Sequence, residues 1–181
     1  DNVRIVHGDV LKVNIPELMD YKPFKVVANL PYYITTPIIM SLLESKLPIE
    51  RLVVMVQKEV AERMIAKPGT KMYGALSVAV QYYTDPYIVM DVPPKAFLPA
   101  PEVTSAVICC PLRSEPPVKV HSEAYFFRAV KAGFAQRRKT FSNTMKTTGL
   151  SKERIEAILA KANIDGSRRG ETFTLDEFAL I

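Results

Sequence analysis

Residues 24–32 read Phe-Lys-Val-Val-Ala-Asn-Leu-Pro-Tyr, which predicts a buried strand followed at once by a turn. The strand, 24–28, is nearly all apolar and ends at Asn29. Thr36 and Pro37 then predict the start of a helix, because proline is favoured at the first helical position. A buried strand followed by a helix is the repeating unit of an α/β sheet.

The same alternation extends to both sides of this stretch. We expect a short strand over 3–7, ending before Asp9, and a further buried strand over 51–56. Helices are expected over 57–66 and 73–83. Apolar strands separated by helices predict a parallel sheet that helices cover on both faces.

The pattern changes after Pro86. Residues 87–92 and 105–110 are β-rich runs with only a proline-studded loop between them, so we expect an antiparallel pair at one edge of the sheet. Beyond a linker over 113–120 the periodicity is helical, and helices are expected over 124–134, 139–146 and 152–162 and from Leu175, with Ser151 as the cap of the third.

Two domains are therefore predicted, an α/β domain over 1–116 and a small all-helical domain over 117–181. The net charge of +5 lies in the last third of the chain, since residues 1–118 hold 12 Lys and Arg against 12 Asp and Glu, and residues 119–181 hold 12 against 7. This excess fits a surface that faces a polyanion and equally fits a solvated helical surface.

Composition narrows the class of protein. No apolar run approaches the roughly 20 residues that cross a bilayer, and the first residues do not resemble a secretory signal, so we expect no membrane association. Cys109 and Cys110 are neighbours in a strand and point to opposite faces, which argues against a disulfide framework or a zinc site. We expect a monomer of the reducing cytoplasm that binds no metal.

Ligands of open α/β sheets bind beyond the carboxyl ends of the strands. Asp9 and Asn29 stand at two such expected ends and mark the place of a site. No glycine-rich turn follows an expected strand, and no acidic residue stands upstream where such folds bind a ribose. We therefore expect the sheet to begin partway through its usual order.

Asn29, Leu30, Pro31 and Tyr32 form a turn with its own chemistry. The Asn29 oxygen and the Leu30 carbonyl can accept both hydrogens of an exocyclic amine such as adenine N6, which frees the nitrogen lone pair. Pro31 removes a competing N–H, and Tyr32 offers a face to a base that has left its stack. The alternative is a strand-to-helix turn without a catalytic role, and the exposed aromatic pair at 32 and 33 argues against it.

Two further segments complete the candidate site. Prolines stiffen the loop 97–105, so Phe97 stands at a fixed angle, either as a second wall for the base or as a core residue that closes the loop. Arg137, Arg138 and Lys139 are adjacent cations that we expect on a helix, where they contact phosphates or form a solvated face.

Three motifs occur in order along the chain: Asn-Leu-Pro-Tyr-Tyr-Ile-Thr at 29–35, Phe-x-Pro-x-Pro-x-Val-x-Ser at 97–105, and Phe-x-Gln-Arg-Arg-Lys at 134–139. Together they resemble the adenine N6,N6-dimethyltransferases of small-subunit ribosomal RNA, often called kasugamycin-resistance methyltransferases. Erythromycin-resistance methylases and mitochondrial transcription factor B proteins are relatives of that family. The resemblance covers essentially the whole chain.

The resemblance implies a Rossmann-like methyltransferase sheet, incomplete at its N-terminus, with a small C-terminal all-helical domain. It implies transfer of methyl groups from S-adenosyl-L-methionine to N6 of two adjacent adenosines near the 3′ end of small-subunit rRNA, in immature 30S subunits. It places Asp9 and Asn29 at the cofactor, with Leu30, Pro31 and Tyr32 around the target base.

One departure concerns the cofactor. Family members carry a glycine-rich cofactor loop and an acidic ribose ligand before the position of Asp1, and this sequence has neither. We therefore expect a truncated chain that keeps the base pocket and binds S-adenosylmethionine weakly or not at all.

Two other functions remain open. A large-subunit adenine methylase of the macrolide-resistance type shares the Asn-x-Pro-Tyr turn, although residues 30–35 and 136–140 are more typical of the small-subunit enzymes. A non-catalytic RNA-binding or ribosome-assembly factor on the same scaffold would fit the missing cofactor loop.

Overall fold

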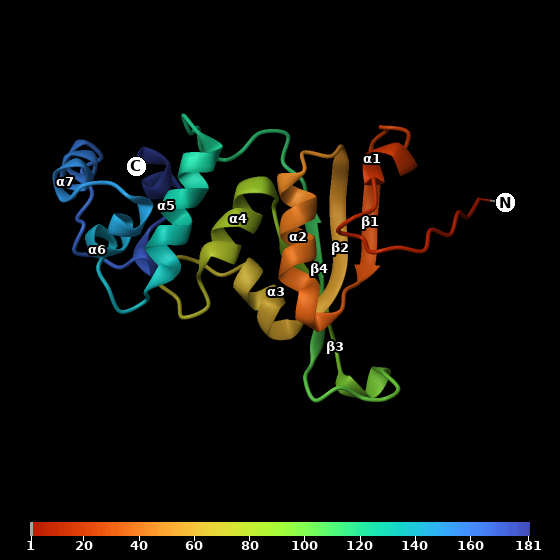
Figure 1. Cartoon of the computed structure of the whole chain (residues 1–181). Helices are drawn as coiled ribbons and strands as arrows, with labels where there is room; N and C mark the ends of the chain where they lie inside the picture. Colours follow the sequence, from red (N-terminus) through yellow and green to blue (C-terminus); the bar gives the residue numbers. More distant parts are fainter. Residues whose placement is uncertain (1) are drawn as a thin grey trace.

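Four strands form one sheet in the computed structural model, which describes residues 2–181 (Figure 1). Their bounds are β1 Phe24–Asn29, β2 Ile49–Gln57, β3 Tyr87–Val92 and β4 Ser105–Pro111. The strand order is β1-β2-β4-β3, with β1 and β2 parallel and the other two pairs antiparallel. The strands predicted over 24–28 and 51–56 and the antiparallel pair after Pro86 are therefore confirmed.

The strand expected over 3–7 is wrong. These residues are irregular and exposed. A strand needs hydrogen-bond partners for its backbone, and among the described residues β1 pairs with β2 alone, so nothing continues the sheet toward this segment. A β-branched run such as Val3–Val6 carries strand propensity, but propensity without a partner does not make a strand.

Helices fill the connections of the α/β half of the chain. Their bounds, including the short 3-10 turns, are α1 Ile15–Leu18, η1 Tyr32–Ile34, α2 Thr35–Glu44, α3 Lys58–Met64, α4 Ala75–Tyr83 and η2 Pro94–Ala96. The predicted helices that begin near Thr36, over 57–66 and over 73–83 correspond to α2, α3 and α4, so these three predictions are confirmed.

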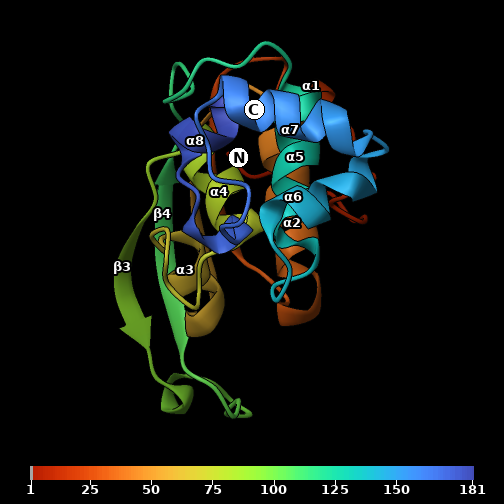
Figure 2. The same ribbon diagram turned by 90° about the vertical axis from the view of Figure 1, so that its left-hand side faces the viewer.

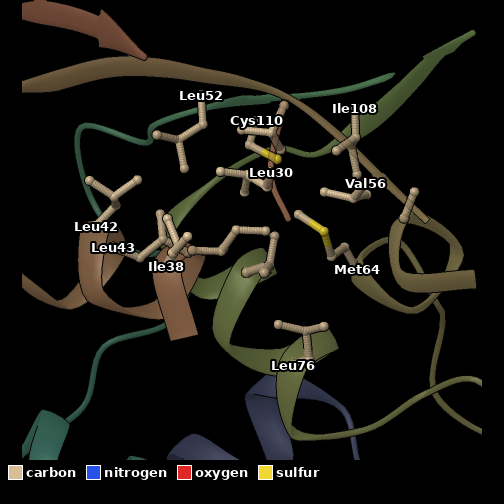
Figure 3. Packing of buried hydrophobic residues seen from close by; sticks show 14 of the residues in the cluster. Leu30, Ile38, Leu42, Leu43, Leu52, Val56, Met64, Leu76, Ile108 and Cys110 are labelled. Carbon is tan, nitrogen blue, oxygen red and sulfur yellow. The ribbon is translucent and has the colours of Figure 1, made fainter. Parts of the chain in front are cut away.

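Between residues 2 and 181 the helices do not cover both faces of the sheet, contrary to the prediction. Strands alternate their side chains, and Leu52, Val54 and Val56 of β2 point into one core shared with α2, α3 and α4 (Figure 3). On the opposite face Val27 is 78% exposed. The expectation came from the strand–helix units of the first part of the chain, but only β1 and β2 pair in parallel; β4 pairs antiparallel with both β2 and β3, and these two pairings do not require a crossover helix.

The helical half begins after β4. Its elements are α5 Glu123–Ala135, α6 Phe141–Met145, η3 Lys146–Thr148, α7 Lys152–Lys161, η4 Gly170–Thr172 and α8 Leu175–Leu180. The amide of Arg154 donates to the Ser151 hydroxyl at 3.3 Å, which confirms the predicted cap of α7. None of the helices between residues 2 and 181 has the length and apolar character that a membrane crossing requires.

A second hydrophobic core lies between α4 and the helical half. Tyr73, Val78 and Tyr82 contribute to it from the α4 region, and Phe126 and Phe141 contribute from α5 and α6. The layers therefore follow one another as sheet, then α2 to α4, then α5 with the remaining helices (Figure 1). The domain boundary between 116 and 117 stays a prediction.

Candidate active site

The turn after β1 is anchored on both sides of Asn29. Asn29 is the last residue of β1 and lies opposite Met55 of β2. The amide of Leu30 donates to the carbonyl of Met55 at 3.1 Å, and the Leu30 side chain enters the core with 6% exposure. The Asn29 side chain is consequently held at the carboxyl end of a parallel strand, where α/β sheets bind their ligands.

Pro31 and Thr35 shape the turn. The Pro31 carbonyl accepts hydrogen bonds from the Ile34 amide at 3.2 Å and from the Thr35 hydroxyl at 3.0 Å, and α2 starts at once. Within residues 2–181, by contrast, no group donates to the Leu30 carbonyl or bonds to the Asn29 side chain. Two adjacent acceptors are therefore left available to a ligand.

Tyr32 is fixed by a partner from a distant strand. Its hydroxyl lies 2.6 Å from the hydroxyl of Ser105, the buried first residue of β4. The neighbouring Tyr33 is 85% exposed and makes no such contact. Of the two tyrosines, only Tyr32 has a ring position set by the fold.

A hollow of about 310 Å³ collects the predicted base-binding residues. It is lined by Asn29, Leu30, Pro31, Tyr32, Phe97, Pro99 and Pro101. Phe97 is half-buried and follows η2, in the loop that projects from the sheet between β3 and β4 (Figure 2). The structure thus brings together segments about 65 residues apart, with one aromatic ring from each, in a space at the lower end of the usual range for ligand sites.

The loop that carries Phe97 is fastened to the start of α3. The Lys58 amide donates to the Thr104 carbonyl at 2.9 Å, and the Lys58 ammonium lies 2.6 Å from the Asp91 carboxylate near the end of β3. The hydrogen bond to Asp91 raises the pKa of Lys58 above its usual value, and the charge of Asp91 adds to the effect. Both ends of the loop are therefore held by one residue.

Asp9 is not gathered at this hollow. It follows the irregular segment 3–7 rather than a strand, so its expected position at a strand end is wrong. Its carboxylate accepts a hydrogen bond from the Leu11 amide at 3.0 Å and lies 3.7 Å from the Lys12 ammonium. In this structure Asp9 stabilises its own turn, and its role at a cofactor stays a prediction.

The basic segment Arg137–Lys139 lies in a turn, not on a helix as expected. Helix α5 ends at Ala135, and α6 begins only at Phe141, whose amide has no acceptor within its own helix and donates instead to the Arg168 carbonyl at 2.7 Å. All three cations are exposed. Arg137 donates to the Lys71 carbonyl, so it also joins the turn to the segment before α4.

Sequence reasoning missed two groups that position the turn, the hydroxyls of Ser105 and Thr35. Thr35 stands at the end of the first motif and Ser105 at the end of the second, so both were visible as motif positions. Their partners are not, because each bond depends on how the strands and the turn pack. Among residues 2–181 no three His, Cys, Asp or Glu side chains gather in a way that could hold a metal ion.

Comparison with known proteins assigns the chain to a family. The profile of the family described as ribosomal RNA adenine dimethylase matches residues 1–180. The chain belongs to the ribosomal RNA adenine dimethylase family. The match covers both the α/β half and the helical half, so the expected family membership is confirmed.

Several curated relatives in this family are about half identical to the chain. Ribosomal RNA small subunit methyltransferase A of Geobacillus sp. (strain WCH70) is 53% identical over 99% of the chain, and that of Bacillus licheniformis is 53% identical over 100% of it. The protein of the same name from Clostridioides difficile is also 53% identical. The chain spans about 65% of the length of these relatives.

Solved structures agree on the fold. A dimethyladenosine transferase from Plasmodium falciparum is 21% identical and superposes with a TM-score of 0.83 over 99% of the chain and 71% of that protein. The 23S rRNA methyltransferase ErmE is 24% identical, with a TM-score of 0.68 over 99% and 70%. This chain therefore has the Rossmann-like methyltransferase fold of the adenine dimethylase family, with helices appended after the sheet.

Proposed function

We propose that the protein transfers methyl groups to N6 of two adjacent adenosines near the 3′ end of small-subunit rRNA, giving dimethyladenosine during small-subunit biogenesis. One observation carries the proposal. The Asn29 side chain and the Leu30 carbonyl are unused acceptors, among the described residues, at a hollow that Tyr32 and Phe97 line. The names of the curated relatives support the choice of the small subunit.

The arrangement fits the chemical difficulty of the reaction. The lone pair of adenine N6 is conjugated with the ring, so the nitrogen attacks poorly. Two acceptors that bind both N6 hydrogens draw the nitrogen toward tetrahedral geometry and stabilise the positive charge that develops as it attacks. The Asn29 amide oxygen and the Leu30 carbonyl can do so without becoming charged themselves. No base is needed, because the methylated amine can release its proton to water.

The aromatic residues serve the step before the reaction. A base inside a stack is out of reach, so the target adenine must be extruded into the site. Tyr32 and Phe97 line the hollow from two separate segments, and either ring provides a stacking surface that compensates for the lost neighbours. The Tyr32–Ser105 hydrogen bond keeps one of these surfaces in place before the RNA arrives.

S-adenosyl-L-methionine is the proposed methyl donor, and its sulfonium supplies an activated methyl group. The residues of this chain do not build its site by themselves. We assign Asn29 a position between donor and base, but Asp9 is held in its own turn, and within residues 2–181 no glycine-rich loop follows a strand. Calorimetry on the 181-residue chain is expected to show no micromolar affinity for S-adenosylmethionine, and such an affinity would refute this assignment.

The proposed partner is the RNA of the immature 30S subunit. The excess positive charge of residues 119–181 and the exposed cations at 137–139 support binding to a polyanion through its phosphates. We further infer that the protein acts as a monomer in the cytoplasm, because ribosomal subunits mature there and a single chain presents both acceptors and both rings.

Methylation of purified subunits tests the function. Small and large subunits from a strain that lacks adenine dimethylation are incubated with labelled S-adenosylmethionine and with the protein joined, before Asp1, to the glycine-rich cofactor segment of a family member, and the modified positions are mapped by primer extension. The same joined protein is used in every methylation assay. We expect label at two adjacent adenosines near the 3′ end of small-subunit rRNA. Label in large-subunit rRNA alone would favour the macrolide-resistance type. Subunit binding without any label would favour an assembly factor.

A variant pair tests the acceptor role. Asn29→Ala is expected to lower the methylation rate by about 10²- to 10³-fold, the usual effect of removing a group that stabilises developing charge. Because the Asn29 side chain is exposed and has no partner among the described residues, its loss should leave the melting temperature unchanged. Tyr33→Ala, a change at an exposed neighbour outside the hollow, is the control and should retain activity.

A further inference from the structure

A second and larger cavity lies between the α2–α4 layer and helix α5. Its volume is about 690 Å³, within the usual range for small-molecule and cofactor sites. Residues of α2, α3 and α4 form one side, and α5 with the turn after it forms the other. None of the residues that we assign to the target base lines it, so it is distinct from the hollow at Asn29.

The rim of this cavity is strongly positive. Arg63, Lys71, Lys131 and Arg137 line it, against a single carboxylate, Glu59. Arg137 has a partial counter-charge, since its Nε lies 3.9 Å from Glu171. The other three cations are exposed and form no ion pair with the residues that the structure describes. Such a rim attracts an anion and disfavours an apolar partner.

The interior of the cavity is aromatic and apolar. Phe127 and Phe134 of α5 are half-buried in its wall. Neighbouring rings hold both of them, because Phe127 stacks on Tyr83 and Phe134 forms a T-shaped pair with Tyr73, each with 5.6 Å between ring centroids. Rings fixed in this way, next to cations, combine the two features with which proteins bind single-stranded nucleic acid.

The two hollows flank the same elements. Thr35 at the start of α2 holds the Pro31 carbonyl of the first site, and Thr36, the next residue, lines the second. Helix α3 repeats the arrangement, since Lys58 binds Thr104 of the proline loop and Arg63, at the other end of the helix, lines the cavity. An RNA strand whose target adenine occupies the hollow at Asn29 can therefore reach the larger cavity along α2 or α3.

We propose that this cavity is a nucleotide subsite for the RNA strand that flanks the target adenosine. The base of the flanking nucleotide packs against the wall formed by Phe127 and Phe134, and its phosphate lies at Arg63, Lys71 and Lys131. The inference rests on the proposed function, because it takes the RNA to be the enzyme's substrate. It adds a second point of attachment that fixes how the strand enters the first site.

Matched charge variants test the phosphate contact. Lys131 lines the cavity, whereas Lys161, also exposed, lies at the end of α7 and does not line it. Lys131→Gln is expected to weaken binding of a fluorescent oligoadenylate and to reduce the slope of log affinity against log salt by about 0.7, the contribution of one phosphate contact to a single strand. Lys161→Gln should change neither quantity. Equal effects of the two variants would overturn the proposal.

The carboxylate in the cavity gives a test of opposite sign. Glu59 lies in the wall close to the proposed phosphate, and removing its charge relieves a repulsion. Glu59→Gln should therefore tighten binding of the oligoadenylate, whereas general loss of folding could only weaken it. Unchanged or weaker binding with an unchanged melting temperature would contradict the assigned position of the phosphate.

A filled cavity tests the base contact. Gly74 lines the cavity, has an extended backbone, and has no atom within 4 Å of a Cβ placed on it. Gly74→Leu should therefore occupy the space and lower RNA affinity about tenfold, the loss expected for one stacked base. Gly74→Ala makes the same change at the cap of α4 without filling the cavity and should bind normally. Normal binding by Gly74→Leu would overturn the subsite.

Two further measurements distinguish the RNA subsite from a site for a free nucleotide and from the proposed function itself. Adenosine 5′-monophosphate is titrated alone, and micromolar binding that Lys131→Gln abolishes would assign the cavity to a free nucleotide and overturn the RNA assignment. Methylation of small subunits is measured in parallel. If the unsubstituted protein methylates small subunits but Lys131→Gln and Lys161→Gln bind the oligoadenylate equally well, only the subsite is refuted. If Lys131→Gln alone weakens binding but the unsubstituted protein methylates nothing, the proposed function is refuted and the subsite stays supported.

Discussion

The hydroxyls of Tyr32 and Ser105 lie 2.6 Å apart and join the turn after β1 to the first residue of β4. Tyr32 is half-buried at the surface of the hollow, whereas Ser105 is fully buried in the sheet. The orientation of the Tyr32 ring is thus fixed by Ser105, a residue of the protein interior. A rigid sheet, rather than the loops around it, determines where a base can lie.

Ser105→Ala should reduce methylation without unfolding the protein. The change removes one hydrogen bond of about 1 kcal/mol and lets the Tyr32 ring rotate, so kcat/KM for small subunits is expected to fall about five- to tenfold. Tyr32→Phe removes the same bond from the other side and should show a similar loss. Because the two variants delete one interaction, the double variant should be no worse than either, and additive losses would show separate roles.

Tyr73→Phe should stabilise the protein or leave its stability unchanged. The Tyr73 side chain is fully buried, and its hydroxyl has no hydrogen-bond partner among the described residues. Burial raises the pKa of this hydroxyl, and the nearby Glu177 charge raises it further. Deleting an unpaired buried hydroxyl should raise the free energy of unfolding by up to about 1 kcal/mol, measured by urea denaturation.

Tyr83→Phe is the contrasting variant, because the Tyr83 hydroxyl donates to the Glu123 carboxylate. It should lower the free energy of unfolding by about 1.5 to 3 kcal/mol, as expected for a hydrogen bond to a charged group. If Tyr73→Phe cost as much as Tyr83→Phe, the Tyr73 hydroxyl would have to have a partner of its own in solution.

Gly170→Ala should be strongly destabilising. A Cβ at Gly170 would lie 2.2 Å from the Gly133 carbonyl oxygen in helix α5, and backbone cannot move aside as a flexible side chain does. The close approach of η4 to α5 would be lost, at a cost of about 3 kcal/mol or more in the free energy of unfolding. Gly74→Ala, with open space around its Cβ, should cost less than about 1 kcal/mol in the same assay.

The Arg168–Glu177 pair should make stability depend on pH in the acid range. The hydrogen bond from Arg168 lowers the pKa of Glu177 below its usual value of 4.5, and the Thr174 amide, at 2.9 Å, contributes as well. Because the folded chain holds this proton less tightly than the unfolded chain, the stabilisation is complete above about pH 4.5 and is lost as pH falls through the lower folded-state pKa.

Glu177→Gln should therefore flatten the acid limb of the stability curve. Since both side chains are partly exposed, the loss at neutral pH is expected to be only about 1 kcal/mol. Lys152 and Glu156 form a more exposed pair with 3.7 Å between charged atoms, so Glu156→Gln should leave the acid limb nearly unchanged. Equal flattening by both variants would mean that the Arg168 contact has no special weight.

The sheet was predictable where the sequence carries its own boundaries. The strand over 24–29 ends at a polar residue and a proline, and the strands at 87–92 and 105–111 enclose a loop too stiff for a crossover helix. The strand expected over 3–7 failed because strand formation depends on a partner, which local propensity does not reveal. The end of α5 before Arg137 was missed for a similar reason, since the turn that follows it makes tertiary contacts, from Arg137 to the Lys71 carbonyl and from Phe141 to the Arg168 carbonyl.

The candidate site divides in the same way. Asn29, Tyr32 and Phe97 were predicted together because their residue types carry a chemistry that a plain turn does not need, and they line one hollow, although their catalytic role stays a prediction. The large cavity at Arg63 and Lys131 could not be predicted. Its walls come from helices that face one another only after the second core has formed.

Helix α4 belongs to both cores, with Leu76 and Val80 on the sheet side and Val78 and Tyr82 on the side of α5. Because this one helix is buried on two sides, unfolding of either layer removes contacts that stabilise the other. We therefore expect both layers to unfold in one cooperative transition. Removing the residues after the linker that follows β4 would expose the aromatic face of α4, which favours aggregation. The sequence therefore divides into two segments at the linker, whereas the folded molecule does not, because both layers pack against α4.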